Sequence, residues 1–321
     1  MINATARLAR SITWASSKQS YITARLLADR DLADDCLRAY AYFRWADDQI
    51  DIALSGADER TAFIQRQKSL IDRLYRGERP GDTTPEEAML ADLIVHDRTP
   101  DSGLRSFIRN FMSVIEFDAY RHGRIPSRHE LAAYTTCLAT AVMDGLQYFI
   151  GNSHPYPKTH DRNLAVTGAH ITHMLRDTLE DLSTGIINIP AEDLFARGLG
   201  IQNVNNEHFR LWVREQVKLA RYCFQQGKTY IDSLDVLRCQ LAGVWYCARF
   251  ECVLNAIEQD GYRLRADYPA RHSFKVWLEM ARLGVVVTLK YIHRRIRAFL
   301  FRFGHPAKFN TKLNYPSYHL K

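Results

Sequence analysis

The sequence predicts an all-α protein that folds as one bundle of long helices. Its ten prolines avoid long stretches of the chain, since the first is Pro80 and none lies between Pro190 and Pro269. Proline breaks helix interiors, so these stretches can form uninterrupted helices. The one β-branched run of note, at 285–287, lies among residues spaced at helical period. No linker rich in proline, glycine or serine divides the chain, which predicts a single domain over residues 1–321.

Turn-forming residues predict where the helices are interrupted. Between Pro80 and Gly103, two clusters of such residues flank a short apolar stretch, which indicates two turns around a short helix. A second loop, at 152–157, separates the helix around Tyr134 from the helix around Asp177.

The cysteines and the apolar stretches predict a cytoplasmic protein. The cysteines show no C-x-x-C pairing and lie among apolar residues, so we expect reduced thiols in the core. They are Cys36, Cys137, Cys223, Cys239, Cys247 and Cys252. The chain begins with arginines among its first residues and lacks the continuous apolar segment of a signal peptide. No stretch reaches the roughly 20 apolar residues of a membrane span.

Positive charge is concentrated at the C-terminal end. The formal net charge is +7, and residues 280–321 contain nine Lys and Arg but no Asp or Glu. Apolar residues recur there at three and four, which predicts a basic amphipathic segment over about 284–321. Two interpretations stay open: a final helix packed on the domain, or peripheral docking on an anionic membrane. Nucleic-acid binding is not expected, because aromatic stacking platforms and basic loops are missing elsewhere.

Two distant stretches, 40–51 and 170–181, carry carboxylates at the same spacing with an arginine beside them, Arg44 or Arg176. The acidic pairs are Asp47 with Asp51 and Asp177 with Asp181. Residues four apart project from one face of a helix, one turn apart. A solvated acidic face is the simpler interpretation of one such pair. The apolar neighbours of both pairs favour carboxylates that line a cavity and bind a cation. Mg²⁺ prefers carboxylates, waters and phosphate oxygens, so we expect a diphosphate substrate.

At these residues the chain resembles the squalene/phytoene synthase family, all-helical enzymes that join two isoprenyl diphosphates head to head. Residues 40–51 match Y-A-x-x-R-x-x-D-D-x-x-D, and 176–181 match R-D-x-x-E-D, followed by I-P-A-E-D-L at 189–194. Smaller pieces are similar to further family elements and follow in the same order, over roughly residues 15–280. They are S-K-Q-S-Y at 17–21, Asp118, Y-T-T-C-L-A-T-A-V at 134–142, A-R-F at 248–250 and G-Y at 261–262.

The resemblance implies an isoprenoid (terpenoid) synthase fold, in which long helices surround a central cavity. It also implies Mg²⁺ as cofactor, with Mn²⁺ as the alternative ion. The residues expected to face the metal are Asp47, Asp48, Asp51, His173, Asp177 and Asp181. Asp48 and Glu180 have a second interpretation, in which they orient waters or the arginines. The catalytic set would be Asp47, Asp51, Asp177 and Asp181 together with Tyr134. Tyr134 would steer a carbocation or relay a proton, unless it is an ordinary core tyrosine.

The resemblance also implies how the substrate is bound. Arg44 and Arg176 would orient the diphosphate, with Lys275 or Arg271 adding a charge from the C-terminal region. The cavity would exclude water from the carbocation. The remaining residues expected to contact the substrate are Ser17, Ser20, Tyr21, Phe43, Leu138, Val142, Leu146 and Phe250.

The chain departs from the family pattern at several positions. His170 and His173 stand where the family usually has Gln and Asn, and the Asn is normally a metal ligand. Either His173 replaces that ligand, or the third ion is bound differently or absent. Thr140 and Met143 replace two glycines, which we expect to narrow the prenyl tunnel, and Phe250 stands where Tyr is common.

Three functions remain open. The first is head-to-head condensation of two farnesyl or geranylgeranyl diphosphates, and the second is a terpene synthase that acts on one prenyl diphosphate. The third is a non-enzymatic assembly factor, against which the retention of repulsive carboxylates argues. Chain length, stereochemistry and oligomeric state stay open. The use of NADPH also stays open, because the chain has no Rossmann fingerprint and the family uses NADPH without one.

Overall fold

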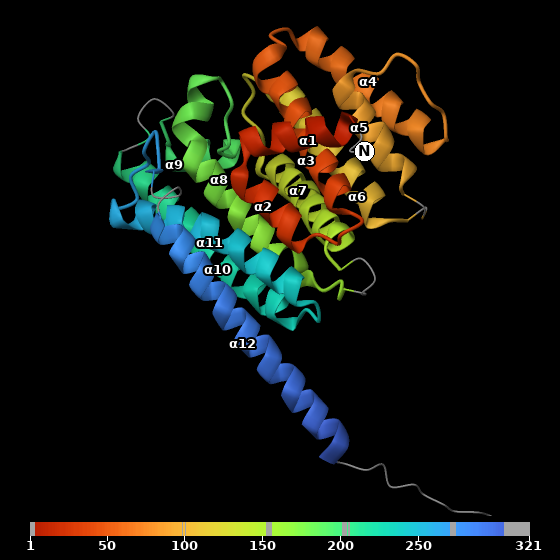
Figure 1. Cartoon of the computed structure of the whole chain (residues 1–321). Helices are drawn as coiled ribbons and strands as arrows, with labels where there is room; N and C mark the ends of the chain where they lie inside the picture. Colours follow the sequence, from red (N-terminus) through yellow and green to blue (C-terminus); the bar gives the residue numbers. More distant parts are fainter. Residues whose placement is uncertain are drawn as a thin grey trace, which may run out of the picture.

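The computed structural model describes residues 4–97, 99, 101–151, 156–200, 204, 206–269 and 274–304. These residues form α-helices joined by short turns, with no strand among them, which confirms the predicted all-α fold. The helices are α1 (Ala4–Ser16), α2 (Lys18–Leu27), α3 (Ala33–Asp48), α4 (Ala57–Tyr75), α5 (Pro85–Val95), α6 (Gly103–Tyr120), α7 (Arg128–Phe149), α8 (Leu164–Ser183), α9 (Ala191–Arg197), α10 (Glu207–Ser233), α11 (Leu237–Gln259) and α12 (Phe274–Gly304). Figure 1 shows them as a bundle from which α12 extends.

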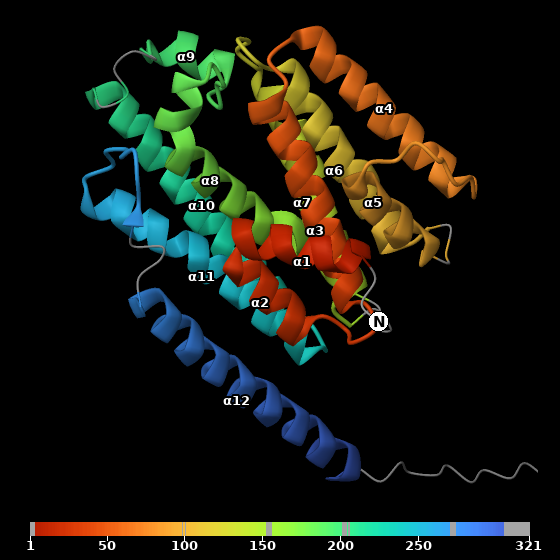
Figure 2. The same cartoon turned by 45° about the horizontal axis from the view of Figure 1, so that its top comes forward.

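Two large buried clusters hold the bundle together. One lies mainly between α3, α6 and α7, and the other between α8, α10 and α11. α6 packs along α7 and α10 along α8, as both views show (Figures 1 and 2). The second pair approaches closely because Gly227 has no side chain: a Cβ there would lie 2.4 Å from the backbone nitrogen of Ala165. α8 therefore lies against the second cluster and presents its other side to α7.

Helix ends follow from local sequence. Thr84 and Ser127 accept hydrogen bonds from the backbone N–H groups of Glu87 and Glu130, whose carboxylates bond back to the cap residues. These capping boxes satisfy amide groups that the first helical turn leaves unpaired. The short helix expected between Pro80 and Gly103 is α5.

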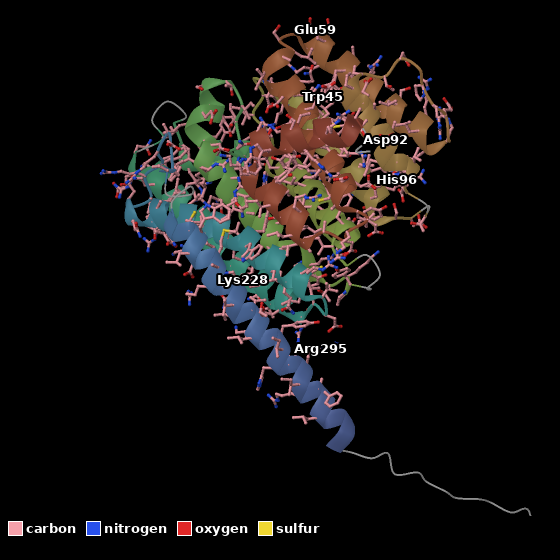
Figure 3. The ribbon with its side chains drawn as sticks, viewed as in Figure 1. Trp45, Glu59, Asp92, His96, Lys228 and Arg295 are labelled. Atoms are coloured by element: carbon pink, nitrogen blue, oxygen red, sulfur yellow. The ribbon has the colours of Figure 1, made fainter. Side chains whose placement is uncertain are left out.

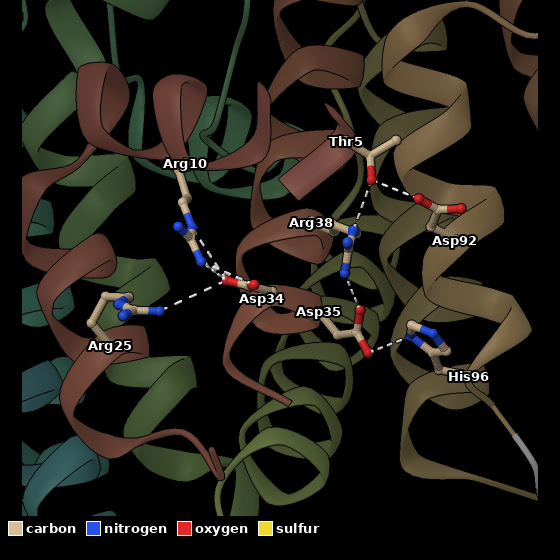
Figure 4. A network of polar contacts seen from close by, with 8 residues as sticks. All are labelled: Thr5, Arg10, Arg25, Asp34, Asp35, Arg38, Asp92 and His96. Carbon is tan, nitrogen blue, oxygen red and sulfur yellow. Dashed lines mark hydrogen bonds and ion pairs between the residues drawn. The ribbon is translucent and has the colours of Figure 1, made fainter. Parts of the chain in front are cut away.

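A polar network ties α1 to α3 and α5 (Figure 4). Arg38 on α3 donates to Asp35 at 2.6 Å and to the Thr5 hydroxyl at 3.1 Å, and Thr5 donates to Asp92 on α5. The second Asp35 oxygen lies 2.8 Å from His96. Both Asp35 and Arg38 are buried, so each charge is compensated by the other. The network holds α3 at a defined position beside the cavity.

The acidic helix α3 ends in a wide turn. Residues Gln49–Ala53 form a π-helix, in which the N–H of Leu54 donates to the carbonyl of Gln49 at 2.9 Å. Asp47 therefore lies in the last α-helical turn and Asp51 in the π-helical turn. π-turns of this kind are frequent at functional sites.

Of the predicted basic C-terminal segment, 284–321, the structure describes residues 284–304, which belong to α12. It lies against α11 in its first half and extends beyond the other helices in its second half (Figures 1 and 2). Residues 305–321 lie outside the described part. Among the described helices, none combines the length and the apolar character needed to cross a membrane. All six cysteines are free thiols.

Candidate active site

A cavity of about 500 Å³ lies between α2, α3, α6, α7, α8 and α11. Much of its wall is apolar and aromatic, and Phe43, Phe107 and Phe111 form a cluster of ring contacts along it. Charged and hydrogen-bonding groups also line it, and several belong to the acidic motifs. These groups include Arg44, Asp47, Asp118, Tyr134, His170 and His173. The cavity thus joins an apolar compartment to polar groups from four helices, α3, α6, α7 and α8.

The first acidic motif is only partly neutralised. Arg44 donates to both oxygens of Asp48, with Nε 3.2 Å from Oδ2, and contacts Asp47 at 3.3 Å. Burial and the neighbouring Asp51 raise the pKa of Asp47 to about 7, and burial also raises the pKa of Asp51. Arg44 therefore compensates Asp48 most closely, and the ionised forms of Asp47 and Asp51 are disfavoured.

The second acidic motif also has one carboxylate that is paired with cationic groups and one whose ionised form is disfavoured. Burial opposes ionisation of Asp177, but two hydrogen bonds of 2.5 Å from Arg176 and a contact of 2.8 Å with His173 Nε2 lower its pKa well below the ordinary value. Burial and Asp177 raise the pKa of Asp181 to about 7. The two arginines expected to orient a diphosphate thus pair with carboxylates of their own helices.

A buried arginine that sequence reasoning missed lies between the two motifs. Arg121, at the end of α6, is 7% exposed and forms an ion pair with Asp118 at 2.7 Å. Burial opposes its charge, but Asp118, Asp181 and Asp51 raise its pKa. Because carboxylates of both motifs act on this one guanidinium, both motifs face the same region.

Asn188 completes the connection. Its amide oxygen accepts from Arg121 and its amide nitrogen donates to Asp181 Oδ2 at 2.6 Å. The segment that follows is held in place because the N–H of Ala191 donates to the carbonyl of Pro126 at 2.9 Å. The sequence signals for these residues were the Asp118/Arg121 spacing on an apolar helix and the position of Asn188 directly before the I-P-A-E-D-L element.

Tyr134 faces the acidic groups from α7. Its hydroxyl donates to Asp118 Oδ2 at 3.2 Å, and the guanidinium of Arg121 lies 5.3 Å from its ring centroid. Burial, then Asp118, raises the pKa of Tyr134 well above its ordinary value, so the phenol keeps its proton. Burial likewise raises the pKa of Asp118 to about 6. The pair places an exchangeable proton in the cavity wall.

His170 is the other unusual group of the wall. It is 6% exposed, its ring lies 5.2 Å from that of Tyr134, and neither ring nitrogen has a hydrogen-bond partner. Burial lowers its pKa to about 3, so the imidazole is neutral. This is the position where the family usually has Gln.

The expected substrate-contacting residues fall into two groups. Those that line the cavity are Ser20, Phe43, Leu138, Val142 and Leu146. Ser17 instead caps α2, where its side chain accepts from the N–H of Ser20. Tyr21 packs edge-on against Trp14, and Phe250 packs against Tyr246 beside the second cluster, both outside the cavity lining.

The remaining expectations concern Thr140 and Met143, which do not line the main cavity, and two residues that the structure does not describe. Thr140 accepts a hydrogen bond from Asn163 at 3.3 Å, and Met143 is buried in the first cluster, so neither narrows the main cavity. The rotation of α7 directs both side chains toward neighbouring helices. The side chain of Lys275 and the whole of Arg271 lie outside the described residues.

The donor set fits a hard divalent cation that arrives with a phosphate ligand. Among the described residues, no three His, Cys, Asp or Glu side chains are close enough to form a ready metal site. Mg²⁺ needs no such cage, because it keeps waters and binds one or two carboxylates together with substrate phosphates. Burial and a neighbouring carboxylate raise the pKa values of Asp47 and Asp181 to about 7, so a bound cation would favour the ionised form of each.

Fold and site together define an all-α protein of the isoprenoid synthase class, in which residues of both acidic stretches, Arg44 and Asp47 of the first and His170 and His173 of the second, line a largely apolar cavity. Residues 14–276 match the squalene/phytoene synthase family, and the chain belongs to that family. The fold is similar to that of a crystal structure described as squalene synthase HpnC from Alicyclobacillus acidocaldarius. The TM-score is 0.64 at 19% identity, over 81% of this chain and 95% of that one. No curated protein matches the sequence.

Proposed function

We propose that this protein is a prenyltransferase that joins two farnesyl or geranylgeranyl diphosphates head to head. One observation carries the proposal: Asp118, Arg121 and Asn188 form a chain of contacts that ends at Asp181 of the second motif, and the charge of Asp51 in the first motif acts on the same Arg121. Asp118 also lines an apolar cavity of about 500 Å³. A prenyl diphosphate has the same two parts, an apolar chain and a highly charged head. Membership of the squalene/phytoene synthase family supports this reaction class.

We propose Mg²⁺ as the cofactor, with Mn²⁺ as a substitute. Asp47 and Asp51 on one side, and Asp177 and Asp181 on the other, would hold it, with Asp48 and His173 adjacent. When bound, it would neutralise charge on the leaving diphosphate. The protein's own groups would do the rest. Arg44 and Arg176 can turn from their carboxylates to the diphosphate, because a cation would compensate those carboxylates instead.

The organic part of the substrate would react inside the apolar wall. Phe43 and Phe107 exclude water from a cationic prenyl chain, and their ring faces carry negative potential that favours a cation. Tyr134 and Asp118 together form the candidate group for moving the proton that head-to-head coupling releases.

A terpene synthase that acts on one prenyl diphosphate is the second candidate function. The observation that favours it is His170, a neutral buried imidazole beside Tyr134 in the cavity wall. A neutral imidazole can accept a proton from a carbocation and so end a reaction with a single substrate.

Mass analysis of products separates these functions. The full chain would be incubated with Mg²⁺ and C15 or C20 diphosphates, with and without NADPH. Coupled C30 or C40 products support the prenyltransferase, and NADPH dependence shows whether the product is reduced. C15 or C20 hydrocarbons alone would establish the terpene synthase. Release of no diphosphate with any substrate would overturn both and leave an assembly factor.

Substrate and product of this reaction are lipids, so we also propose peripheral contact with a membrane. A prenyl chain could then enter or leave without crossing bulk water, which disfavours exposed apolar surface.

A further inference from the structure

α12 packs on the domain through one face only. Met280 and Val287 are buried against α11, and the indole N–H of Trp245 donates to the Met280 carbonyl at 2.9 Å. Further along, the Tyr291 hydroxyl donates to the carbonyl of Asp235 at 2.8 Å. The last of these contacts is made by Arg294, which donates to the Leu234 carbonyl at 2.8 Å. α12 is therefore attached over its first five turns or so.

A second apolar face of α12 is exposed along the helix. We call it the outer stripe, and its members are Val285, Leu289, Ile292, Ile296 and Leu300. All are exposed, Leu289 by 62% and Ile296 by 53%. The outer stripe starts five residues after Met280 and keeps the same three-and-four spacing. At about 100° per residue, the outer stripe is therefore turned about 140° from the packed face.

The outer stripe continues where α12 has left the domain. Every side chain from Arg295 to Leu300 is exposed, and Figure 3 shows Arg295 on the part of α12 that lies beyond the other helices. A contiguous row of large apolar side chains on such a helix is unusual for a surface that only water contacts.

Two partners could cover the outer stripe, a second copy of α12 or an anionic lipid surface, and charge decides between them. Lys290, Arg295 and Arg297 flank the outer stripe, and residues 280–321 contain no acidic residue. Arg282 is already paired with Glu279 and is not counted among these cations. A second copy of the same helix, in either direction, would bring these cations together and be repelled. An anionic lipid surface would attract them, and an interfacial helix has this combination of an apolar face and basic flanks.

We propose that α12 docks in the interface of an anionic membrane, with the outer stripe among the acyl chains and the flanking cations at the headgroups. The docked helix would lie parallel to the membrane plane, since its packed face must stay on α11. The proposal concerns binding alone and holds whether the bound substrate is coupled or cyclised.

Docking of α12 would bring the membrane close to a groove that lies beside the main cavity. A groove between α11 and α12 is lined by Trp245 and Gly284 together with Val285 and Leu289 of the outer stripe. Trp245 also lines the main cavity, so this residue borders both the groove and the cavity. If the proposed function holds, a prenyl chain that passes this indole reaches a groove whose rim is in lipid.

Flotation with vesicles tests the docking directly. Full-length protein would be mixed with phosphatidylcholine vesicles that contain or lack phosphatidylglycerol, at low and high salt. The test variant is Ile292→Glu/Ile296→Glu. The matched control is Leu211→Glu/Leu219→Glu, which introduces the same charge at two similarly exposed leucines of α10. Thermal melts establish that both variants fold.

We expect wild type and control to bind anionic vesicles, with binding that falls as salt rises because screening weakens exposed charges. The stripe variant should bind at least about tenfold less, since two charges in the acyl region are costly. Equal binding by both variants, or no binding by wild type, would overturn the proposal. The proposal would also be overturned if the wild type sedimented as a dimer without binding vesicles and only the stripe variant sedimented as a monomer. A wild-type protein that floats with anionic vesicles but has no prenyltransferase activity would instead count against the proposed function only.

Discussion

His173 Nε2 lies 2.8 Å from Asp177 Oδ2, one turn earlier on α8, in the position where the family usually has a metal-binding Asn. A cation held by Asp177 would therefore be within reach of the imidazole. If His173 is a ligand, the wild type should respond unusually well to Mn²⁺, because Mn²⁺ tolerates imidazole better than Mg²⁺ does. His173→Asn should keep activity with Mg²⁺ within about tenfold and should lose this response to Mn²⁺. Steady-state rates with each metal give the measurement. A loss of activity with unchanged metal preference would show that His173 is not a ligand.

Neutralising Asp177 and neutralising Asp181, the two aspartates of the motif on α8, should change the free energy of unfolding in different ways. Asp177→Asn removes the partner of Arg176 and should lower stability by about 1 kcal/mol at neutral pH. Asp181→Asn removes a carboxylate whose ionised form is disfavoured, so the variant should be equally stable or more stable. Denaturant unfolding measures both. Turnover should fall by orders of magnitude in each, and full activity of either would contradict its metal role.

Stability should decrease with rising pH where Asp47 and Asp181 ionise. Both have a native pKa raised to about 7, above the unfolded value, so the native state binds more protons between about pH 4 and pH 7. This contribution is complete below the unfolded pKa and is lost as pH rises through 7. Asp47→Asn should therefore raise the free energy of unfolding at pH 8 by about 1 kcal/mol, after allowance for solvent screening, and change it little at pH 4. Urea titrations in EDTA test this, and an equal gain at both pH values would contradict it.

Added Mg²⁺ should act on the same charge. In EDTA-free buffer with pyrophosphate, the wild-type Tm should rise with Mg²⁺ concentration, because a ligand of the native state alone stabilises it. Asp47→Asn and Asp181→Asn should each reduce this rise by more than half. A wild-type Tm that is independent of Mg²⁺ would count against the proposed site.

Arg121 should be far more important for stability than an exposed arginine on the same loop. Arg121→Met leaves the buried carboxylate of Asp118 without its ion pair and should cost about 3 kcal/mol. The control is Arg124→Met, which breaks an exposed pair with Glu130 and should cost under about 1 kcal/mol. Similar losses in the two variants would show that Arg121 does not hold the motifs together.

Gly145 should limit the length of the prenyl chain. It lines the cavity, and a Cβ there would lie 2.8 Å from the Phe107 ring, so Gly145→Ala must push that ring. We expect turnover of a C20 diphosphate to fall by at least about fivefold more than turnover of a C15 diphosphate. The control is Gly200→Ala, at a glycine with open space around it, which should change neither the turnover rate nor the ratio of C20 to C15 turnover. An unchanged C20 to C15 ratio in Gly145→Ala would place the end of the chain elsewhere.

Periodicity in the sequence predicted the helices and the two acidic motifs, because both depend on spacing along one element. Periodicity did not predict the roles of Arg121 and Asn188, because these roles arise from contacts with Asp118 and Asp181. Nothing in the spacing of one helix indicates which partner another helix will supply.

Side-chain direction was the other quantity that the sequence did not determine. Thr140 and Val142 are two residues apart on α7, yet only Val142 lines the cavity, because packing between α7 and α8 sets the rotation of the helix. Ser17 shows a second ambiguity, since a serine hydroxyl serves equally as a helix cap or a ligand contact. A further turn type, the π-helix at 49–53, has no signature in hydrophobic period.

That wide turn after Asp48 makes the first motif sensitive to chain length. A π-turn holds one residue more than the α-helical turn it replaces, so the residues before and after it are out of phase with a regular helix. Deleting Ile52, which is 77% exposed, would keep Arg44 and Asp47 where they are and convert the turn to α-helix. The segment after the deletion would then rotate by about 100° relative to α3. Asp51 lies within the turn, so the conversion itself would change the position of Asp51 relative to Asp47. A single-codon deletion at a solvent-facing position would thus disturb the acidic motif without altering any acidic residue.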